Sequence, residues 1–136
     1  MTTSSKKPLN PLLGLRHLAL SVKNLEACEH FYTQLLDMQL VWKPDSDNVY
    51  LSSGADNLAL HRAPADFEPS NQHQHLDHLG FLLKEKDDVD AWHERLSTLG
   101  IQISAAPKDH RDGTRSFYCL DPDGNSVQMI WIAGLT

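Results

Sequence analysis

Features that would mark a specialised class of protein are scarce in this chain. Its 136 residues include only two cysteines, Cys28 and Cys119, both in apolar stretches, so we expect buried free thiols rather than a disulfide framework. No apolar run approaches the roughly 20 residues that span a bilayer, and Met1 to Lys7 lack the apolar stretch of a signal peptide. The formal net charge of −6 argues against a nucleic-acid partner. We therefore expect a soluble, cytoplasmic domain with neither a membrane nor a nucleic-acid partner.

An internal repeat organises the chain. Residues 15–22 read LRHLALSV around His17, and residues 76–83 read LDHLGFLL around His78, an offset of 61 positions (78 − 17 = 61). The same offset pairs six further apolar positions: Leu18 with Leu79, Leu20 with Phe81, Cys28 with Val89, Phe31 with Trp92, Leu35 with Leu96, and Leu40 with Ile101. Chance does not easily supply this many matches in one register, so a duplicated unit is the better explanation.

Each half of the repeat predicts the element order β-α-β-β-β. A helical apolar period follows each first strand, with Asn24 as one N-cap, Asp87 or Asp88 as the other, and Gly100 as a stop. Turn residues then separate three short strand-like runs in each half: 39–42, 48–52 and 57–61, then 101–104, 115–120 and 126–132. We expect an N-terminal extension over 1–14, module one over 15–62, a linker over 63–75 and module two over 76–132.

The two faces of the predicted strands differ in chemistry. Alternate side chains of a strand point to opposite faces. One face is uniformly large and apolar and should pack beneath the helices: Leu18, Leu20, Val22, Leu58, Leu60, Leu79, Phe81, Leu83, Val127, Met129 and Trp131. The other is small or polar: His17, Ala19, Ser21, Ala59, His61, His78, Gly80, Leu82, Gln128 and Ile130. It suits either a solvated sheet face or the lining of a cavity, and the equivalent positions of His17 and His78 favour the cavity.

These residues resemble the vicinal oxygen chelate superfamily, which includes glyoxalase I, bleomycin-resistance proteins, fosfomycin-resistance transferases and extradiol dioxygenases. The resemblance runs from Leu15 to about Ile132, nearly the whole chain. It rests on RHLALSV, on the helix that carries Phe31-Tyr32 and ends in Leu35-Leu36, and on FYCLDPDGNSVQMI at 117–130. It implies an α+β fold in which two tandem βαβββ modules form curled mixed sheets around a cavity. It also implies a homodimer in which modules of two chains complete each cavity.

The resemblance places metal ligands on the first and last strands of the modules. In this sequence those positions are His17, Ala59, His78 and Gln128. Ala59 cannot bind a metal, and Gln128 stands where the metal enzymes usually carry glutamate. His61, two residues beyond Ala59, shares its face and is a candidate third nitrogen ligand. Such a set would suit Zn²⁺, Ni²⁺ or Co²⁺ better than Mg²⁺, which prefers oxygen.

The missing carboxylate discriminates between the reactions of the superfamily. Isomerisation of the glyoxalase I type needs a metal-bound carboxylate base, and the extradiol iron site pairs two histidines with a carboxylate, so both are disfavoured. Thiol transfer needs mainly Lewis-acid activation and stays compatible. We predict a glyoxalase-like enzyme, a lyase or transferase, whose divalent metal is held by His17, His78 and Gln128. The alternative is a metal-independent binding or sequestration protein of the bleomycin-resistance type.

Candidate residues for binding a small molecule lie outside the ligand set. A basic patch in an otherwise acidic chain precedes the strand of Tyr118: Lys108, His110, Arg111 and Arg115. It is either a rim that selects an anionic ligand or a solvated hairpin loop. We name Arg111, Arg115, Tyr118 and Trp42 as candidate substrate-binding residues, although an aromatic residue such as Trp42 can equally be core. His73 and His75 follow Pro69 in an irregular segment and are expected in an exposed loop.

Overall fold

The computed structural model describes residues 11, 13–68 and 76–135. Two helical segments are present in the described residues. The first is α1 (Leu25–His30), which continues into the short π-helix η1 (Phe31–Leu35), and the second is α2 (Asp88–Thr98). The first sheet contains β1 (His17–Val22), β2 (Gln39–Asp45), β3 (Asn48–Ser52) and β4 (Asn57–Arg62). The second contains β5 (Leu79–Leu82), β6 (Ile103–Asp109), β7 (Arg115–Leu120) and β8 (Ser126–Trp131).

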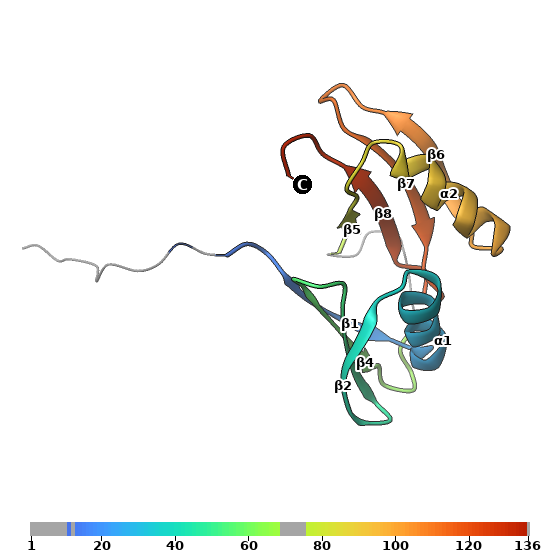
Figure 1. Cartoon of the computed structure of the whole chain (residues 1–136). Helices are drawn as coiled ribbons and strands as arrows, with labels where there is room; N and C mark the ends of the chain where they lie inside the picture. The colour runs from blue at the N-terminus through green and yellow to red at the C-terminus, as the bar shows by residue number, and fades with distance from the viewer. Residues whose placement is uncertain (1–10, 12, 69–75, 136) are drawn as a thin grey trace, which may run out of the picture.

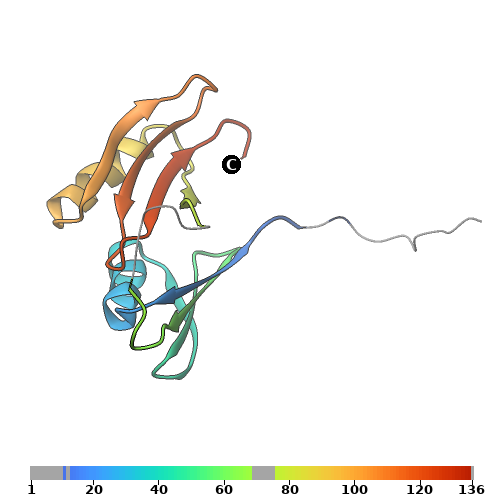
Figure 2. The ribbon, with the colours of Figure 1, turned by 180° about the vertical axis from the view of Figure 1, so that it is seen from behind.

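The two sheets share one topology. Their strand orders are β1-β4-β3-β2 and β5-β8-β7-β6, so the first strand of each module lies parallel to the last and the other pairs are antiparallel. Neither sheet closes on itself. One module lies above the other, with α1 and α2 on the same side of the molecule (Figures 1 and 2). The predicted α+β fold of two βαβββ modules is confirmed.

Two predicted boundaries shift for identifiable reasons. The strand expected at Ile101 begins at Ile103, because the Ile101 amide still bonds to the Leu96 carbonyl at the end of α2 (3.0 Å). Gly100 ends this helix with a φ of +82°, a conformation that glycine adopts without strain. The strand expected over 39–42 runs on to Asp45, with register irregularities beside β3 that an edge strand tolerates.

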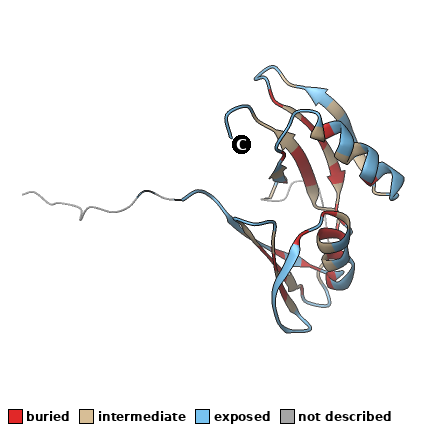
Figure 3. Ribbon diagram, viewed as in Figure 1, coloured by how far each residue is buried: buried red, intermediate tan, exposed pale blue. Residues whose placement is uncertain are grey.

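The apolar strand face forms the core, as its alternation predicts. Residues that are buried in both sheets lie beneath the helices, where α1 contacts β4 and α2 contacts β6, β7 and β8 (Figure 3). Leu58, Leu60, Val127 and Met129 are buried, whereas Leu18, Phe81 and Trp131 are partly buried against them. The opposite face stays largely open: Ala19 and Ser21 are exposed on β1 and Leu82 on β5. The chain therefore leaves uncovered the face on which the candidate site residues lie.

A loop of the second module holds the helix of the first. The carboxylate of Asp123, buried between β7 and β8, accepts hydrogen bonds from the backbone N–H of Lys23 (2.7 Å) and of Asn24 (2.8 Å). It also accepts one from the Asn24 side chain (3.0 Å), so Asn24 is a donor to Asp123 and makes no cap bond of its own. Beside it, Tyr32 donates to the buried carboxylate of Asp121 (2.7 Å). Figure 1 shows the ends of β7 and β8 meeting α1.

Two buried thiols and a buried tyrosine hydroxyl predict a loss of stability at alkaline pH. Burial and the nearby Asp121 and Asp123 charges raise the pKa of the Cys28 thiol far above its ordinary 9.0; burial and Asp121 raise the pKa of Cys119 to about 12. Burial and Asp121 also raise the pKa of Tyr32 well above 10.0. As the pH rises, these groups ionise in the unfolded chain before they ionise in the folded protein. Their contribution to the free energy of unfolding is therefore full below about pH 9 and is lost as the pH rises further.

The urea midpoint should therefore fall between about pH 8 and about pH 10. A Cys28→Ala, Cys119→Ala variant should show a flatter pH profile, whatever its stability at neutral pH. An equal slope in the variant and the wild type would contradict this assignment.

Some predictions fall where the structure gives no description. His73, His75, most of the expected linker and most of the expected N-terminal extension lie outside the described residues. Among the helices that are described, none is both long and apolar enough to cross a membrane.

Candidate functional site

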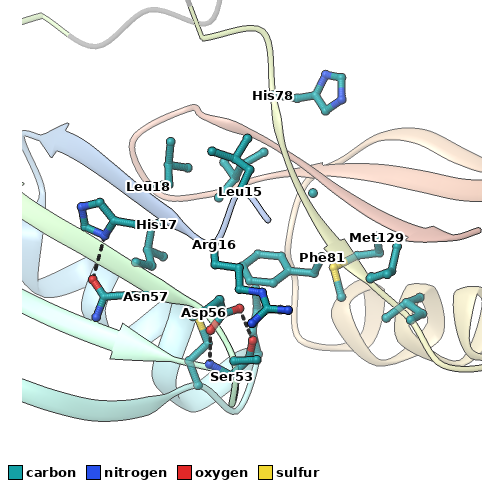
Figure 4. Close-up of a pocket in the computed structure, with 18 of the residues that line it drawn as sticks. Leu15, Arg16, His17, Leu18, Ser53, Asp56, Asn57, His78, Phe81 and Met129 are labelled. Atoms are coloured by element: carbon teal, nitrogen blue, oxygen red, sulfur yellow. Dashed lines mark hydrogen bonds between the residues drawn. The ribbon is translucent and has the colours of Figure 1, made fainter. Parts of the chain in front are cut away.

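A cavity of about 840 Å³ lies where the two modules meet. It is lined from the first module by His17 and Asn57 and from the second by His78, Phe81 and Met129. His17 turns to Asn57 at one side of this cavity, and His78 lies at the other (Figure 4). The repeat therefore places its two equivalent histidines on the border of one cavity, but the described part of a single chain does not bring their rings together.

Each candidate histidine has one ring nitrogen held by an oxygen acceptor. Nδ1 of His17 lies 2.8 Å from Oδ1 of Asn57, its direct partner across β1 and β4. Nδ1 of His78 lies 2.6 Å from a carboxylate oxygen of Asp77. When Nδ1–H donates to such an oxygen, the lone pair of Nε2 is left for a metal ion. The acceptors at Nδ1 therefore suit the tautomer that ligation through Nε2 requires.

A second cavity of about 590 Å³ lies on the open face of the second sheet. His78, Gln128 and Tyr118 line it, and the His78 and Tyr118 rings meet edge to face at 5.4 Å. Burial, and then the charge of Asp77, raise the pKa of the Tyr118 hydroxyl. This group therefore stays protonated at neutral pH and can donate a hydrogen bond. His78 borders both cavities, which makes it the residue that connects them.

The predicted ligands fall into separate groups in this chain. His78 and Gln128 share a cavity, whereas His17 borders only the other one. His61 is on the face predicted for it, where Nδ1 contacts Oδ1 of Asn48 at 2.6 Å. It is four residues along β4 from the partner of His17, about 13 Å at the rise of a strand. Within residues 11, 13–68 and 76–135, no three His, Cys, Asp or Glu side chains gather closely enough to hold a metal ion.

The candidate substrate residues also separate. Arg111 lines the second cavity, together with Lys108 and His110. Arg115 does not: its guanidinium bonds to Asp90 of α2 (2.8 and 3.0 Å) and to Asp109 (3.1 Å). Arg115 has the strand parity of buried Phe117 and its guanidinium binds Asp90 of the helix α2, so it does not line the second cavity with the other basic residues.

The other aromatic candidate lies apart from both cavities. Trp42 stacks on Tyr50 with ring centroids 5.1 Å apart and is 58% exposed on the edge strand β2. Neither of these cavities includes it. Trp42 is therefore not core, and its role as a substrate residue requires something that covers the open first sheet.

Sequence reasoning missed the side chains that orient the candidate ligands. Asn57 and Asp77 hold the two histidines, and Ser116 contacts Gln128. Asp77 is adjacent to His78 and could have been noticed, but Asn57 is 40 residues from His17 and meets it only through strand pairing. Ser116 and Tyr118 are alternate residues of one strand and so lie on the same face as Gln128. This strand parity was the signal from which the contact of Ser116 with Gln128 could have been predicted.

Fold and site together define a protein of two βαβββ modules, with histidines and an amide on or beside the sheet faces that line two cavities. The family model of the Glyoxalase/Bleomycin resistance protein/Dioxygenase superfamily matches residues 14–129, and the chain belongs to this superfamily. This result confirms the resemblance inferred from the repeat and from the strand–DPDG–strand segment.

Curated relatives and a solved structure match over most of the chain. It is 27% identical over 120 residues to the metallothiol transferase FosB of Bacillus licheniformis, covering 88% of this chain and 76% of the relative. It is 29% identical over 118 residues to the glutathione transferase FosA of Serratia marcescens, covering 87% and 80%. Lactoylglutathione lyase of Agrobacterium tumefaciens superposes with a TM-score of 0.72 at 25% identity, covering 90% of this chain and 96% of the other.

Proposed function

We propose that this chain is a metal-dependent enzyme that transfers a small thiol to an electrophilic small molecule. The observation that carries the proposal is the pair of His78 and Gln128 on one cavity, with Nδ1 of His78 held by Asp77. Two relatives that match most of the chain have thiol-related names, a metallothiol transferase and a glutathione transferase. The absence of glutamate at position 128 disfavours proton-shuttling chemistry and leaves thiol transfer compatible.

The donor set fits a divalent transition metal. His17 and His78 would offer Nε2 and Gln128 its amide oxygen, a set that suits Zn²⁺, Ni²⁺ or Co²⁺. The ion would supply Lewis-acid polarisation of a substrate oxygen. His61 has the same held Nδ1, but its distance along β4 disfavours it as a partner of His17. The proposed site therefore has three protein donors and room for substrate.

Residues around the second cavity would bind and orient the substrate. Lys108 and Arg111 place positive charge at the rim, which favours an anionic substrate. The Tyr118 hydroxyl, protonated at neutral pH, would donate a hydrogen bond to a substrate oxygen. In the transfer, the thiol loses its proton and its sulfur forms a bond to the electrophilic carbon. The bond from that carbon to oxygen breaks, and the oxygen takes up one proton, so that no net proton is gained or lost.

A homodimer would complete the site. Both sheets leave a face uncovered, and exposed apolar side chains remain there and on the edge strand, including Leu82 (45%) and Trp42 (58%). His17 and His78 do not meet within one chain, so ligands from two chains would have to combine. We also propose that the protein is located in the cytoplasm.

A metal-independent binding protein is the second candidate. The observation that favours it is the loss of both carboxylates at the ligand positions, where Ala59 and Gln128 stand. The same cavities and cationic rim would then hold an anionic molecule without chemistry. Binding that persists in a chelator would support this candidate over the enzyme.

Elemental analysis of tag-free protein, combined with an activity assay, tests the proposal. We expect about one Zn²⁺, Ni²⁺ or Co²⁺ per site and transfer of glutathione to fosfomycin or a related small anionic epoxide, with loss of turnover after chelation. Protein that carries no metal after incubation with these ions and binds the anion equally well in chelator would contradict the enzyme and favour the second candidate.

Restoring the missing carboxylate should tighten metal binding. In a Gln128→Glu variant, a charged oxygen would replace a neutral one at the same reach, and we expect Zn²⁺ affinity to rise by about tenfold to a hundredfold. Isothermal titration measures it, with Gln128→Leu as the control that should bind more weakly than wild type. Weaker binding by the glutamate variant would mean that residue 128 does not reach the metal.

A further inference from the structure

The side chain of Gln128 has two chemically different ends. Its carbonyl oxygen can bind a cation, but its NH₂ group, a double donor, cannot. A carboxylate would offer oxygen at either end, so only an amide must be turned the correct way. Gln128 lies between Gly80 on β5 and Tyr118 on β7, and it is 9% exposed. What holds this amide therefore decides whether it can act as a ligand.

Ser116 fixes the nitrogen end. Nε2 of Gln128 donates to Oγ of Ser116 at 3.0 Å, and Ser116 is 1% exposed. The carbonyl oxygen is left on the side of Gly80, where a Cβ, if present, would lie 3.7 Å from it. A Cβ at this distance would be in ordinary van der Waals contact with the oxygen, and Gly80 lies two residues after His78 in the chain.

His110 gives the contact a direction. Its Nε2 lies 2.8 Å from the same Ser116 hydroxyl, and its backbone N–H bonds to the Thr114 carbonyl (2.8 Å), which fixes the hairpin. A hydroxyl has one proton. In the His110 tautomer whose Nε2 carries no proton, the Ser116 hydroxyl donates to this nitrogen and its oxygen accepts from Gln128, so the three side chains form a chain from the amide to the imidazole. In that tautomer His110 favours the serine oxygen as the partner of the Gln128 NH₂ group.

We propose that Ser116 and His110 are positioning residues, which turn the carbonyl oxygen of Gln128 toward Gly80, a residue that lines the first cavity together with His78, and so make a neutral amide a directed metal ligand. The inference deepens the proposed function and rests on it for the metal, but the orientation itself is a property of the metal-free protein. It assigns a role to His110 other than that of a rim cation. It also explains how a site without glutamate keeps an oxygen donor in place.

Nuclear magnetic resonance of the metal-free protein tests the orientation. The side-chain amide protons of Gln128 should show cross-relaxation with Ser116 and exchange slowly with water, and Ser116→Ala should speed this exchange by about tenfold. Cross-relaxation of the amide protons with Gly80 instead would place nitrogen on the cavity side and overturn the proposal. This result does not depend on whether the protein binds a metal.

Zinc titration tests the consequence. Ser116→Ala and His110→Ala should each lower Zn²⁺ affinity by about tenfold, as expected for lost partners of a ligand, whereas exposed Ser104→Ala should not. In a Gln128→Glu background, Ser116→Ala should lower Zn²⁺ affinity by less than about threefold, because either oxygen of the carboxylate can bind the metal. Equal losses in both backgrounds would reduce Ser116 to a packing role and overturn the proposal. Wild-type protein that binds no Zn²⁺ would refute the metal site and leave the orientation to be decided by the resonance experiment.

Discussion

Replacing either His17 or His78 by alanine is expected to lower divalent-metal affinity by at least about a hundredfold, which is ~3 kcal/mol of binding free energy. Each variant would lose one imidazole ligand of the metal. In the wild type, Asn57 holds Nδ1 of His17 and Asp77 holds Nδ1 of His78. The remaining donors, one imidazole and one neutral amide, would bind weakly because neither carries charge. Zn²⁺ titration of the two single variants at neutral pH measures the effect.

The controls use histidines elsewhere in the chain. His30 is exposed on α1 and borders neither cavity, so His30→Ala should bind Zn²⁺ as wild type does. His61→Ala should also have little effect, given its separation from His17 along the sheet. Full-strength binding by a His17→Ala, His78→Ala double variant would contradict the assignment and move the metal to other histidines, such as His73 and His75.

Removing the Asp123 carboxylate should give the largest loss of stability. Its oxygens accept three hydrogen bonds from Lys23 and Asn24, so Asp123→Ala would leave donors at the start of α1 without a partner and remove one of the contacts between the modules. We expect a cost of about 2–4 kcal/mol and a midpoint of thermal unfolding lower by about 10 °C. Calorimetry or circular dichroism measures both.

Two comparisons separate this role from a general effect of substitution. Asp123→Asn keeps an acceptor but loses the charge, and should cost about half as much, since charge-assisted bonds are about twice as strong as neutral ones. Asp66→Ala, at an exposed aspartate of the segment that follows the first module, should stay within about 0.5 kcal/mol of wild type. Equal midpoints for Asp123→Ala and Asp66→Ala would mean that the loop does not hold α1.

The fold was accessible from the sequence because the repeat and strand parity are local signals. The matched positions around His17 and His78 predict two equal modules, and the apolar parity identifies the buried faces. The bonds between modules were not accessible. Asp123 lies about 100 residues from Asn24, and its segment predicted only a turn. Which donors a turn residue reaches depends on tertiary packing, and no periodicity encodes it.

The site was predicted in part for the same reason. Parity places Gln128 and Tyr118 on the same face, and the structure puts both in one cavity with His78. Arg115 was grouped with its basic neighbours by proximity in the sequence, whereas parity separates it from them. An odd-numbered residue of β7 faces α2, where Asp90 binds Arg115. The assembly of His17 with His78 depends on chain contacts that one sequence does not encode locally.

Mixing two defective variants tests the metal site and its proposed sharing between chains most directly. Mixed His17→Ala and His78→Ala subunits, exchanged by mild unfolding and refolding, would form heterodimers in which one of two shared sites keeps both histidines. The account predicts recovery of Zn²⁺ binding to about a quarter of the wild-type sites, since random pairing makes half of the dimers mixed. Titration that finds dimers without any recovered binding, or light scattering that finds only monomers, would contradict it.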